Sequence, residues 1–396
     1  MNASMSARAT HPRAMQQLLE LELLLDQQLL DWRLDSSAAA ASAMVALEWS
    51  ACVWAAAETA GPWPIAPRDI ERGLALARRP VFICGVHRSG TTLMRDLLDS
   101  HPALSVLPAE GAFHCGPLRR IAGRSAGELR ALGREWVRRL ENHSNQPPFW
   151  LLGRSCPTQS PYVTFARALM AWWPAVERAL ARDTRRWPLV AVALAYAYCT
   201  AGGCIAPAAL RWVEKTPANE RFIDGLLAEF PDASIIHVVR DPMAVFNSRK
   251  RMELHTYAAF RNVRAVLRDL ARTYRVAIAR SSAEPANQYL LIRYEQLVND
   301  QRATIERLAA FLGIQPLPIL WRPTIGGVPA GSNSSFESGA SRGRILADVE
   351  HLPDRALTAA EQQLVATMVG ESASRLGYRI TAVRGLRARL RRIAYR

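Results

Sequence analysis

Continuous apolar runs alternate with helically spaced apolar residues through much of the chain. Val81–Cys84, Ser234–Val239 and Tyr289–Arg293 are short runs rich in β-favouring residues, a pattern typical of strands buried in a parallel sheet. In Thr91–Leu98, which follows the first run, the apolar residues recur at helical spacing. This alternation predicts an α/β fold with a parallel sheet and helices on both of its faces.

The same pattern predicts a helical segment before the first strand and a second helical segment inserted between strands of the sheet. Apolar residues at helical spacing predict two N-terminal helices, at 15–32 and 36–59. The middle of the chain lacks strand alternation and predicts a helical insertion. Further predicted elements are a strand at 211–216, helices at 119–141, 162–180, 187–200, 221–230, 257–280, 303–312 and 358–376, and loops at 146–161 and 324–344.

These elements divide the chain into three parts. Residues 1–70 form the predicted N-terminal helical extension, and residues 71–383 form one P-loop-like domain that contains the helical insertion. Residues 384–396 form a basic tail, for which a solvated helix face is the simpler interpretation and an anionic lipid or nucleic acid contact the alternative.

A glycine-bounded loop joins the first strand to its helix. Four residues separate Gly85 from Gly90, and Thr91 and Thr92 follow. Such a loop directs backbone N–H groups and the positive end of the helix dipole at one point, which suits a tetrahedral anion. A nucleoside triphosphatase needs lysine where Thr91 stands, and the nearest cation here is Arg88.

The string RSGTTLMRDLLDSHP, which starts at Arg88, resembles the 5′-phosphosulfate loop of sulfotransferases that use 3′-phosphoadenylyl sulfate (PAPS). It is most similar to the branch that contains tyrosylprotein sulfotransferases and many bacterial homologues. The resemblance covers about residues 78–380. It implies that the loop residues Arg88, Ser89, Gly90, Thr91 and Thr92 hold the 5′-phosphosulfate.

A second pair follows the strand at 234–239. Arg240 stands at its end, and Ser248 comes eight residues later in the next predicted helix. An arginine fork and a hydroxyl suit a phosphate, and the resemblance implies that this pair holds the 3′-phosphate of PAPS. Arg249, Lys250 and Arg251 follow and are either additional phosphate contacts or a solvated run of charge.

The resemblance also implies the groups of the transfer step. Lys215, in the string VEKTP, and Arg88 would stabilise the leaving phosphate, and Glu110 would be the general base. His87, His114 and His255 are rival bases. Two weaker nucleotide contacts are implied: Tyr294 after the third run and Ser334 in a late loop.

The composition indicates the compartment and the cofactors that such an enzyme would have. The chain has 396 residues and a net charge of +15, and Lys215 and Lys250 are its only lysines. Its six cysteines form no CxxC pair, which predicts free thiols and no zinc site. We expect a cytoplasmic protein with no signal peptide, and we interpret 38–57 as a packed helix rather than a membrane span.

The sequence therefore predicts a PAPS-dependent sulfotransferase that needs no metal and releases 3′,5′-ADP. The tryptophans at 150, 172, 173 and 187 favour an apolar or sugar-like acceptor if they do not simply form core, so a small-molecule, lipid or carbohydrate hydroxyl is expected. A homodimer stays open, and a nucleic acid partner is not expected. The alternatives are another P-loop transferase or kinase, and a non-catalytic nucleotide-binding scaffold.

Overall fold

The fold is taken from a computed structural model. It describes residues 51–108, 110–112, 125, 128, 161–181, 186–253, 263–283, 288–330, 343–345 and 357–380. The predictions for residues 15–32, for 119–141 apart from residues 125 and 128, for 146–160, for the start of the helix at 257–280 and for the basic tail lie outside this part of the chain. Of the predicted helix at 36–59, residues 51–59 are described and are helical, and the helix continues to residue 60.

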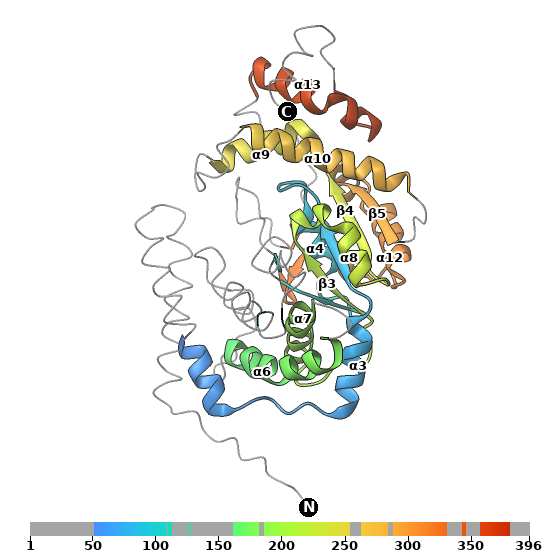
Figure 1. Cartoon of the computed structure of the whole chain (residues 1–396). Coiled ribbons are helices and arrows are strands. Elements are labelled where there is room, and N and C mark those ends of the chain that lie inside the picture. Colours follow the sequence, from blue (N-terminus) through green and yellow to red (C-terminus); the bar gives the residue numbers. More distant parts are fainter. Residues whose placement is uncertain are drawn as a thin grey trace, which may run out of the picture. The chain divides into compact units, whose positions relative to one another are not determined.

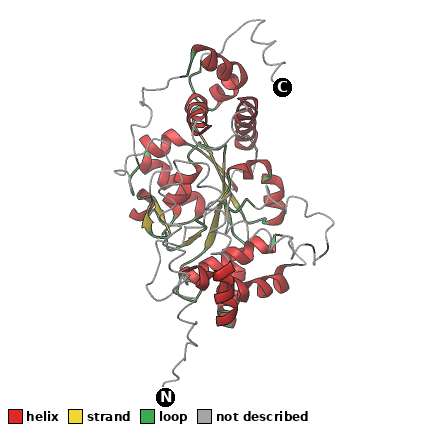
Figure 2. Ribbon diagram, turned by 90° about the vertical axis from the view of Figure 1, so that its left-hand side faces the viewer, coloured by secondary structure: helices red, strands yellow, loops and turns green. Residues whose placement is uncertain are grey.

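A five-stranded sheet forms the centre of the fold, in the order β2-β3-β1-β4-β5. Its parallel pairs are β1 with β3, β1 with β4, and β4 with β5. Figure 2 shows its strands in yellow between red helices. The strands are β1 (Val81–Cys84), β2 (Leu104–Val106), β3 (Arg211–Lys215), β4 (Ser234–Val239) and β5 (Tyr289–Arg293).

Each face of the sheet packs against its own helices because side chains alternate along a strand. Val81 and Ile83 of β1 join a core with Met94 and Leu97 of the helix Thr91–Leu98 and Leu308 of a later helix. On the other face the Phe82 ring packs against Phe230, and His237 contacts Thr273. Figure 1 shows the helices on both sides of these strands.

The helices follow the predicted alternation. They are α3 (Pro67–Ala77), α4 (Thr91–Leu98), α6 (Pro161–Leu180), α7 (Trp187–Thr200), α8 (Ile223–Glu229), α9 (Pro242–Glu253), α10 (Val263–Ser281), α11 (Tyr294–Asn299), α12 (Gln301–Leu312) and α13 (Ala359–Arg375), with 3-10 turns η4 (Pro217–Arg221) and η7 (Pro318–Trp321). The predicted α/β class is confirmed. None of the described helices is long and apolar enough to cross a bilayer.

Some elements of the structure were not predicted. The sequence interpretation has no helix at α3 and no strand at β2, and it places one loop over 324–344. The structure has a small hairpin there, made of β6 (Thr324–Ile325) and β7 (Val328–Pro329). The Asp99 carboxylate, at the end of α4, holds this hairpin by accepting from the Thr324 hydroxyl (2.8 Å) and the Gly327 N–H (2.9 Å).

The contacts divide the chain into two compact units. One contains the described residues up to Arg78 and those between Leu107 and Trp212, with α3, α6 and α7. Its helix α7 is buried almost all around, from Trp187 to Tyr198, as expected for a helix that is apolar on every face. The other unit contains the rest of the sheet and all of its phosphate-binding candidates from Arg88 to Tyr294.

Candidate active site

The carboxyl ends of neighbouring parallel strands bring the candidate residues to one edge of the sheet. In the strand register, Ile83 pairs with Lys215, and Cys84 pairs with His237. Val239 pairs with Arg293 in the same way. Lys215, the loop after β1, Arg240 and Tyr294 therefore stand side by side, at the edge where α/β sheets bind ligands.

Gly85 lets the loop after β1 turn tightly against the neighbouring strand. Its φ is +140°, and a Cβ there would lie 2.2 Å from the Val238 carbonyl oxygen and 2.9 Å from the Ser89 Oγ. The Gly85 N–H donates to the Pro217 carbonyl at 3.1 Å, and the Ser89 N–H donates to the Val86 carbonyl at 3.1 Å. The loop is therefore fixed from both sides, and the buried Ser89 side chain faces its base.

Gly90 starts helix α4 in the left-handed region, with φ +100°. The first hydrogen bond within the helix runs from the Met94 N–H to the Gly90 carbonyl at 3.0 Å. The N–H groups of Thr91 and Thr92 thus have no acceptor within the helix, as at any helix start. They stand at the positive end of the dipole, where an anion is favoured. The Thr91 side chain is buried, whereas Thr92 is half-buried.

Arg88 connects the loop to helix α9. Its φ is +75°, unusual for a residue with a side chain. Its Nε donates to the Ser248 hydroxyl at 2.9 Å. The Arg240 Nη1 donates to the Arg88 carbonyl at 3.3 Å, and the Arg240 guanidinium lies 4.1 Å from the centre of the Tyr294 ring. The structure thus brings together the four predicted residues Arg88, Arg240, Ser248 and Tyr294.

The electrostatics of this cluster favour an anion. Burial, and then the positive charge of Arg240, lowers the pKa of Arg88. Two guanidinium groups that stand together in a partly buried place repel each other, and a bound phosphate or sulfate relieves that repulsion. A bidentate guanidinium contact also matches the geometry of such an oxyanion.

Lys215 is held at the end of β3 with only 3% of its surface exposed. Its neighbour Glu214 is also buried and accepts from the Thr216 hydroxyl (2.5 Å) and the Asn219 amide (2.6 Å). These bonds fix the turn after Lys215. Asp96 of α4 is near enough that the Lys215 charge lowers the pKa of its carboxyl, against a larger rise from burial.

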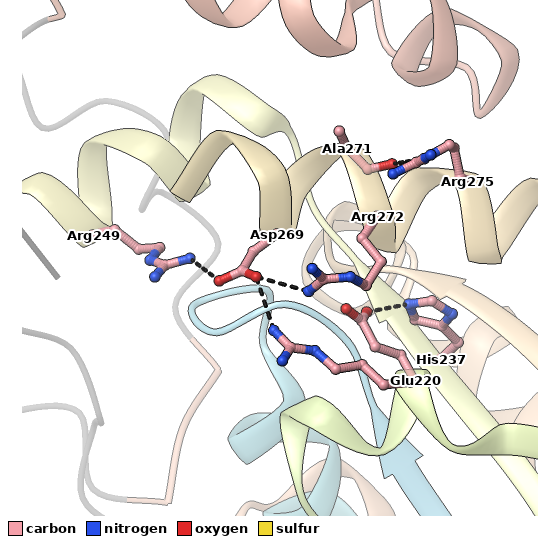
Figure 3. A network of polar contacts seen from close by, with 8 residues as sticks. Glu220, His237, Arg249, Asp269, Ala271, Arg272 and Arg275 are labelled. Atoms are coloured by element: carbon pink, nitrogen blue, oxygen red, sulfur yellow. Dashed lines mark hydrogen bonds and ion pairs between the residues drawn. The ribbon is translucent and has the colours of Figure 1, made fainter. Parts of the chain in front are cut away.

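The sequence interpretation missed Asp269 of α10, which contacts several arginines near the site (Figure 3). Its carboxylate accepts from Arg249 (3.3 Å), Arg272 (2.9 Å) and Arg221 (2.9 Å). Arg249 follows Ser248 directly, so this carboxylate ties the phosphate-binding part of α9 to α10. Arg272 lies at the local spacing of three residues, whereas Arg221 and Arg249 lie 48 and 20 residues away, so no local sequence signal reveals their contacts with Asp269.

The remaining candidates are not among the residues that these contacts join. Glu110 is half-buried and belongs to the unit of α6 and α7. Ser334, His114, His255 and Trp150 lie outside the described residues. Trp172 and Trp187 are almost fully buried and serve as core, so their side chains give no support to an acceptor pocket. Within the described ranges, no group of three His, Cys, Asp or Glu side chains could hold a metal ion.

The comparison with protein families identifies the family of this chain. A model of the sulfotransferase family matches residues 80–318, more than half of the chain. The chain belongs to the sulfotransferase family. Members transfer sulfuryl groups, and the matched residues include Arg88, Lys215, Arg240, Ser248 and Tyr294. A search of curated proteins finds no match.

The chain is also similar to several sulfotransferases of solved structure. The sulfotransferase domain of the Synechococcus PCC 7002 olefin synthase is 20% identical, with 76% of this chain and 96% of that domain covered and a TM-score of 0.44. The domain from the curacin biosynthetic pathway is 18% identical (76% and 98% covered, TM-score 0.39). STF1 from Mycobacterium tuberculosis H37Rv is 17% identical (70% and 76%, TM-score 0.35). At these sequence identities and TM-scores, the matches support no further assignment of function.

Proposed function

We propose that this sulfotransferase transfers a sulfuryl group from PAPS to a hydroxyl group of a small molecule, lipid or carbohydrate, and releases 3′,5′-ADP (PAP). The observation that carries the proposal is the cluster of Arg88, Arg240 and Ser248 at the carboxyl edge of the sheet. It offers two cations and a hydroxyl next to a helix start. PAPS carries two separate anionic groups, and this arrangement suits both.

The 5′-phosphosulfate is assigned to the loop and the start of α4. Arg88 supplies charge there, and the N–H groups of Thr91 and Thr92 supply donors. The 3′-phosphate is assigned to Arg240 and Ser248. The Tyr294 ring, which packs on Gly90 and under Arg240, supports the nucleotide from the side of β5.

In the transfer step, the acceptor oxygen forms a bond to sulfur while the bond from sulfur to the 5′-phosphate oxygen breaks. The acceptor proton passes to a general base, for which Glu110 is our candidate ahead of His87, His114 and His255. Negative charge grows on the leaving phosphate oxygen. The cations of Lys215 and Arg88 stabilise that charge most in the transition state, which lowers the barrier.

We also propose that the enzyme works in the cytoplasm, because the described cysteines Cys52, Cys84, Cys199 and Cys204 are free thiols. A reducing compartment maintains that state. A homodimer is compatible with the proposal and is not required by it, since the phosphate-binding candidates come from one chain.

Calorimetric titration with PAP and with ADP tests the proposal, on the wild type and on Arg240→Ala. We expect wild type to bind PAP at least about tenfold more tightly than ADP, because charged hydrogen bonds to the 3′-phosphate are each worth about 1.5–3 kcal/mol. The variant should lose this preference. Equal binding of both nucleotides by wild type would remove the 3′-phosphate site and the proposed use of PAPS.

A second measurement addresses the acceptor. Wild type and Glu110→Gln are incubated with radiolabelled PAPS and a panel of phenols, sterols, lipids and sugars. Transfer of label to one class, with release of PAP, identifies the hydroxyl acceptor. Label transfer to none of these classes, but to a protein tyrosine, would overturn the proposed acceptor class and leave the use of PAPS intact.

A further inference from the structure

The peptide unit between Arg240 and Asp241 is held on both of its edges. The Tyr274 hydroxyl, from α10, donates to the Arg240 carbonyl oxygen. The Asp241 N–H donates to the Glu295 Oε1 at 2.8 Å. The C=O and N–H of a trans peptide point in opposite directions within one plane. These two bonds therefore fix the plane of the peptide that follows the Arg240 side chain.

Tyr378 contacts both groups that hold this peptide. Its hydroxyl donates to the Glu295 Oε2 at 3.0 Å, so each oxygen of that carboxylate has a donor. Its ring meets the Tyr274 ring edge to face, with centroids 6.1 Å apart at 68°. Tyr378 thus contacts Glu295 and Tyr274, the two residues that bond to the Arg240–Asp241 peptide.

The end of helix α13 directs Tyr378 to this place. The Tyr378 N–H donates to the Ala373 carbonyl, and the Gly377 N–H donates to the Ser374 carbonyl, both at 3.0 Å. This bond pair is a Schellman motif, and Gly377 supplies its left-handed residue with φ +86°. The chain reverses there, and the buried Tyr378 side chain turns back toward β5, where the Arg293 guanidinium lies 5.7 Å from its ring centre.

Tyr378 is not part of the segment that matches the sulfotransferase family, which ends at residue 318. The position of Arg240 therefore depends on an element that follows that segment. The Tyr378 hydroxyl also stays a donor at neutral pH, because burial and then the Glu295 charge raise its pKa.

We propose that Tyr378 is a positioning residue for the 3′-phosphate group: through Glu295 and Tyr274 it holds the Arg240–Asp241 peptide so that the Arg240 guanidinium is preorganised. The inference rests on the proposed role of Arg240 in binding PAPS. A guanidinium that is already oriented loses less conformational entropy on binding. Tyr378 thus affects affinity for the 3′-phosphate without touching the nucleotide.

Tyr378→Phe tests this, with Tyr289→Phe as the matched control. Each variant keeps its ring and loses one hydroxyl hydrogen bond, and the control loses a bond to His237 at 2.7 Å. PAP and ADP affinities are measured by calorimetry, and thermal melts test whether both variants fold. We expect Tyr378→Phe to weaken PAP about five- to tenfold, with ADP within about twofold, since one hydrogen bond is worth about 1 kcal/mol. The control should leave the ratio of the two affinities unchanged.

A double variant separates positioning through Arg240 from a general structural effect. In the Arg240→Ala background, Tyr378→Phe should cause no further loss of PAP affinity, because the group that it positions is gone. Additive losses would overturn the inference, as would an unchanged PAP-to-ADP ratio in Tyr378→Phe. If Tyr378→Phe does not fold, Glu295→Gln tests the next group along the same route, and an unchanged PAP-to-ADP ratio in that variant would also overturn the inference. Wild type that fails to prefer PAP would instead refute the proposed function, so the two failures are distinguishable.

Discussion

Arg88 and Ser248 lie 160 residues apart in the sequence, and the Arg88 Nε donates a hydrogen bond to the Ser248 hydroxyl over 2.9 Å. Arg88 belongs to the loop assigned to the 5′-phosphosulfate, and Ser248 belongs to the helix assigned to the 3′-phosphate. One bond therefore links the two halves of the proposed nucleotide site. A change in one half should alter the other half too.

Replacement of Ser248 by alanine removes this link and the hydroxyl that we propose as a ligand of the 3′-phosphate. We expect Ser248→Ala to weaken PAP binding about tenfold or more, because hydrogen bonds to charged groups are worth about 1.5–3 kcal/mol. ADP, which lacks the 3′-phosphate, should lose less. Calorimetry measures both. Ser282→Ala, at an exposed serine that bonds only to its own helix turn among the contacts found, is the control. Equal losses for PAP and ADP would contradict the assignment of Ser248.

Gly90 should tolerate no side chain. A Cβ there would lie 2.4 Å from the Tyr294 Cδ2, and its φ is +100°. Gly313 has φ +66° and no atom within 4 Å of its Cβ position, so Gly313→Ala is a matched control for backbone strain alone. Gly313→Ala should lose about 1–2 kcal/mol of unfolding free energy, and Gly90→Ala should lose more because it adds the clash with Tyr294. Only Gly90→Ala should displace Tyr294 and abolish PAP binding. Retention of wild-type PAP affinity by Gly90→Ala would show that the Tyr294 contact is dispensable.

The only two lysines of the chain provide a test of the transfer step. Lys215→Ala should lower kcat about 10²–10³-fold, because it removes the charge that we propose to act mainly in the transition state. KM for PAPS should change by less than about threefold. Lys250, which forms a partly exposed ion pair with Glu361 at 2.8 Å, is the control. Its alanine variant should keep kcat within about twofold. A similar fall in both variants would exclude a special role for Lys215.

Much of the site was predictable because its signals are local. Consecutive residues form the loop from Gly85 to Gly90, and consecutive residues also form the strand that ends at Arg240. Parallel pairing then brings the strand ends to one edge of the sheet. Helix α3 also carries a local signal, with proline at its first turn and Asp69 near its start. The sequence interpretation overlooked that signal.

Other parts depend on contacts between distant residues. Strand β2 has three residues, too few for a periodic pattern. Each strand of the β6–β7 hairpin has two, and Asp99 fixes them from more than 200 residues away. The bond from Tyr378 to Glu295 spans 83 residues. Such contacts leave no periodicity in either segment, so only the folded structure reveals them.

Asp96 should make stability fall as the pH rises. Burial raises the pKa of its carboxyl from 3.8 to about 6, although Arg95, 2.5 Å away, opposes the rise. Between these values the native state binds more protons than the unfolded state. The free energy of unfolding therefore decreases from about pH 4 to pH 6 by up to about 3 kcal/mol from this group. An asparagine at this position does not titrate.

Urea unfolding between pH 4 and pH 7 measures this effect. Compared with wild type, Asp96→Asn should lose less stability over that range, whatever its stability at a single pH, since the variant also leaves Arg95 without its charged neighbour. If Asp96→Asn instead runs parallel to wild type, the Asp96 carboxyl titrates alike in the folded and unfolded chains, and Arg95 then offsets the whole effect of burial.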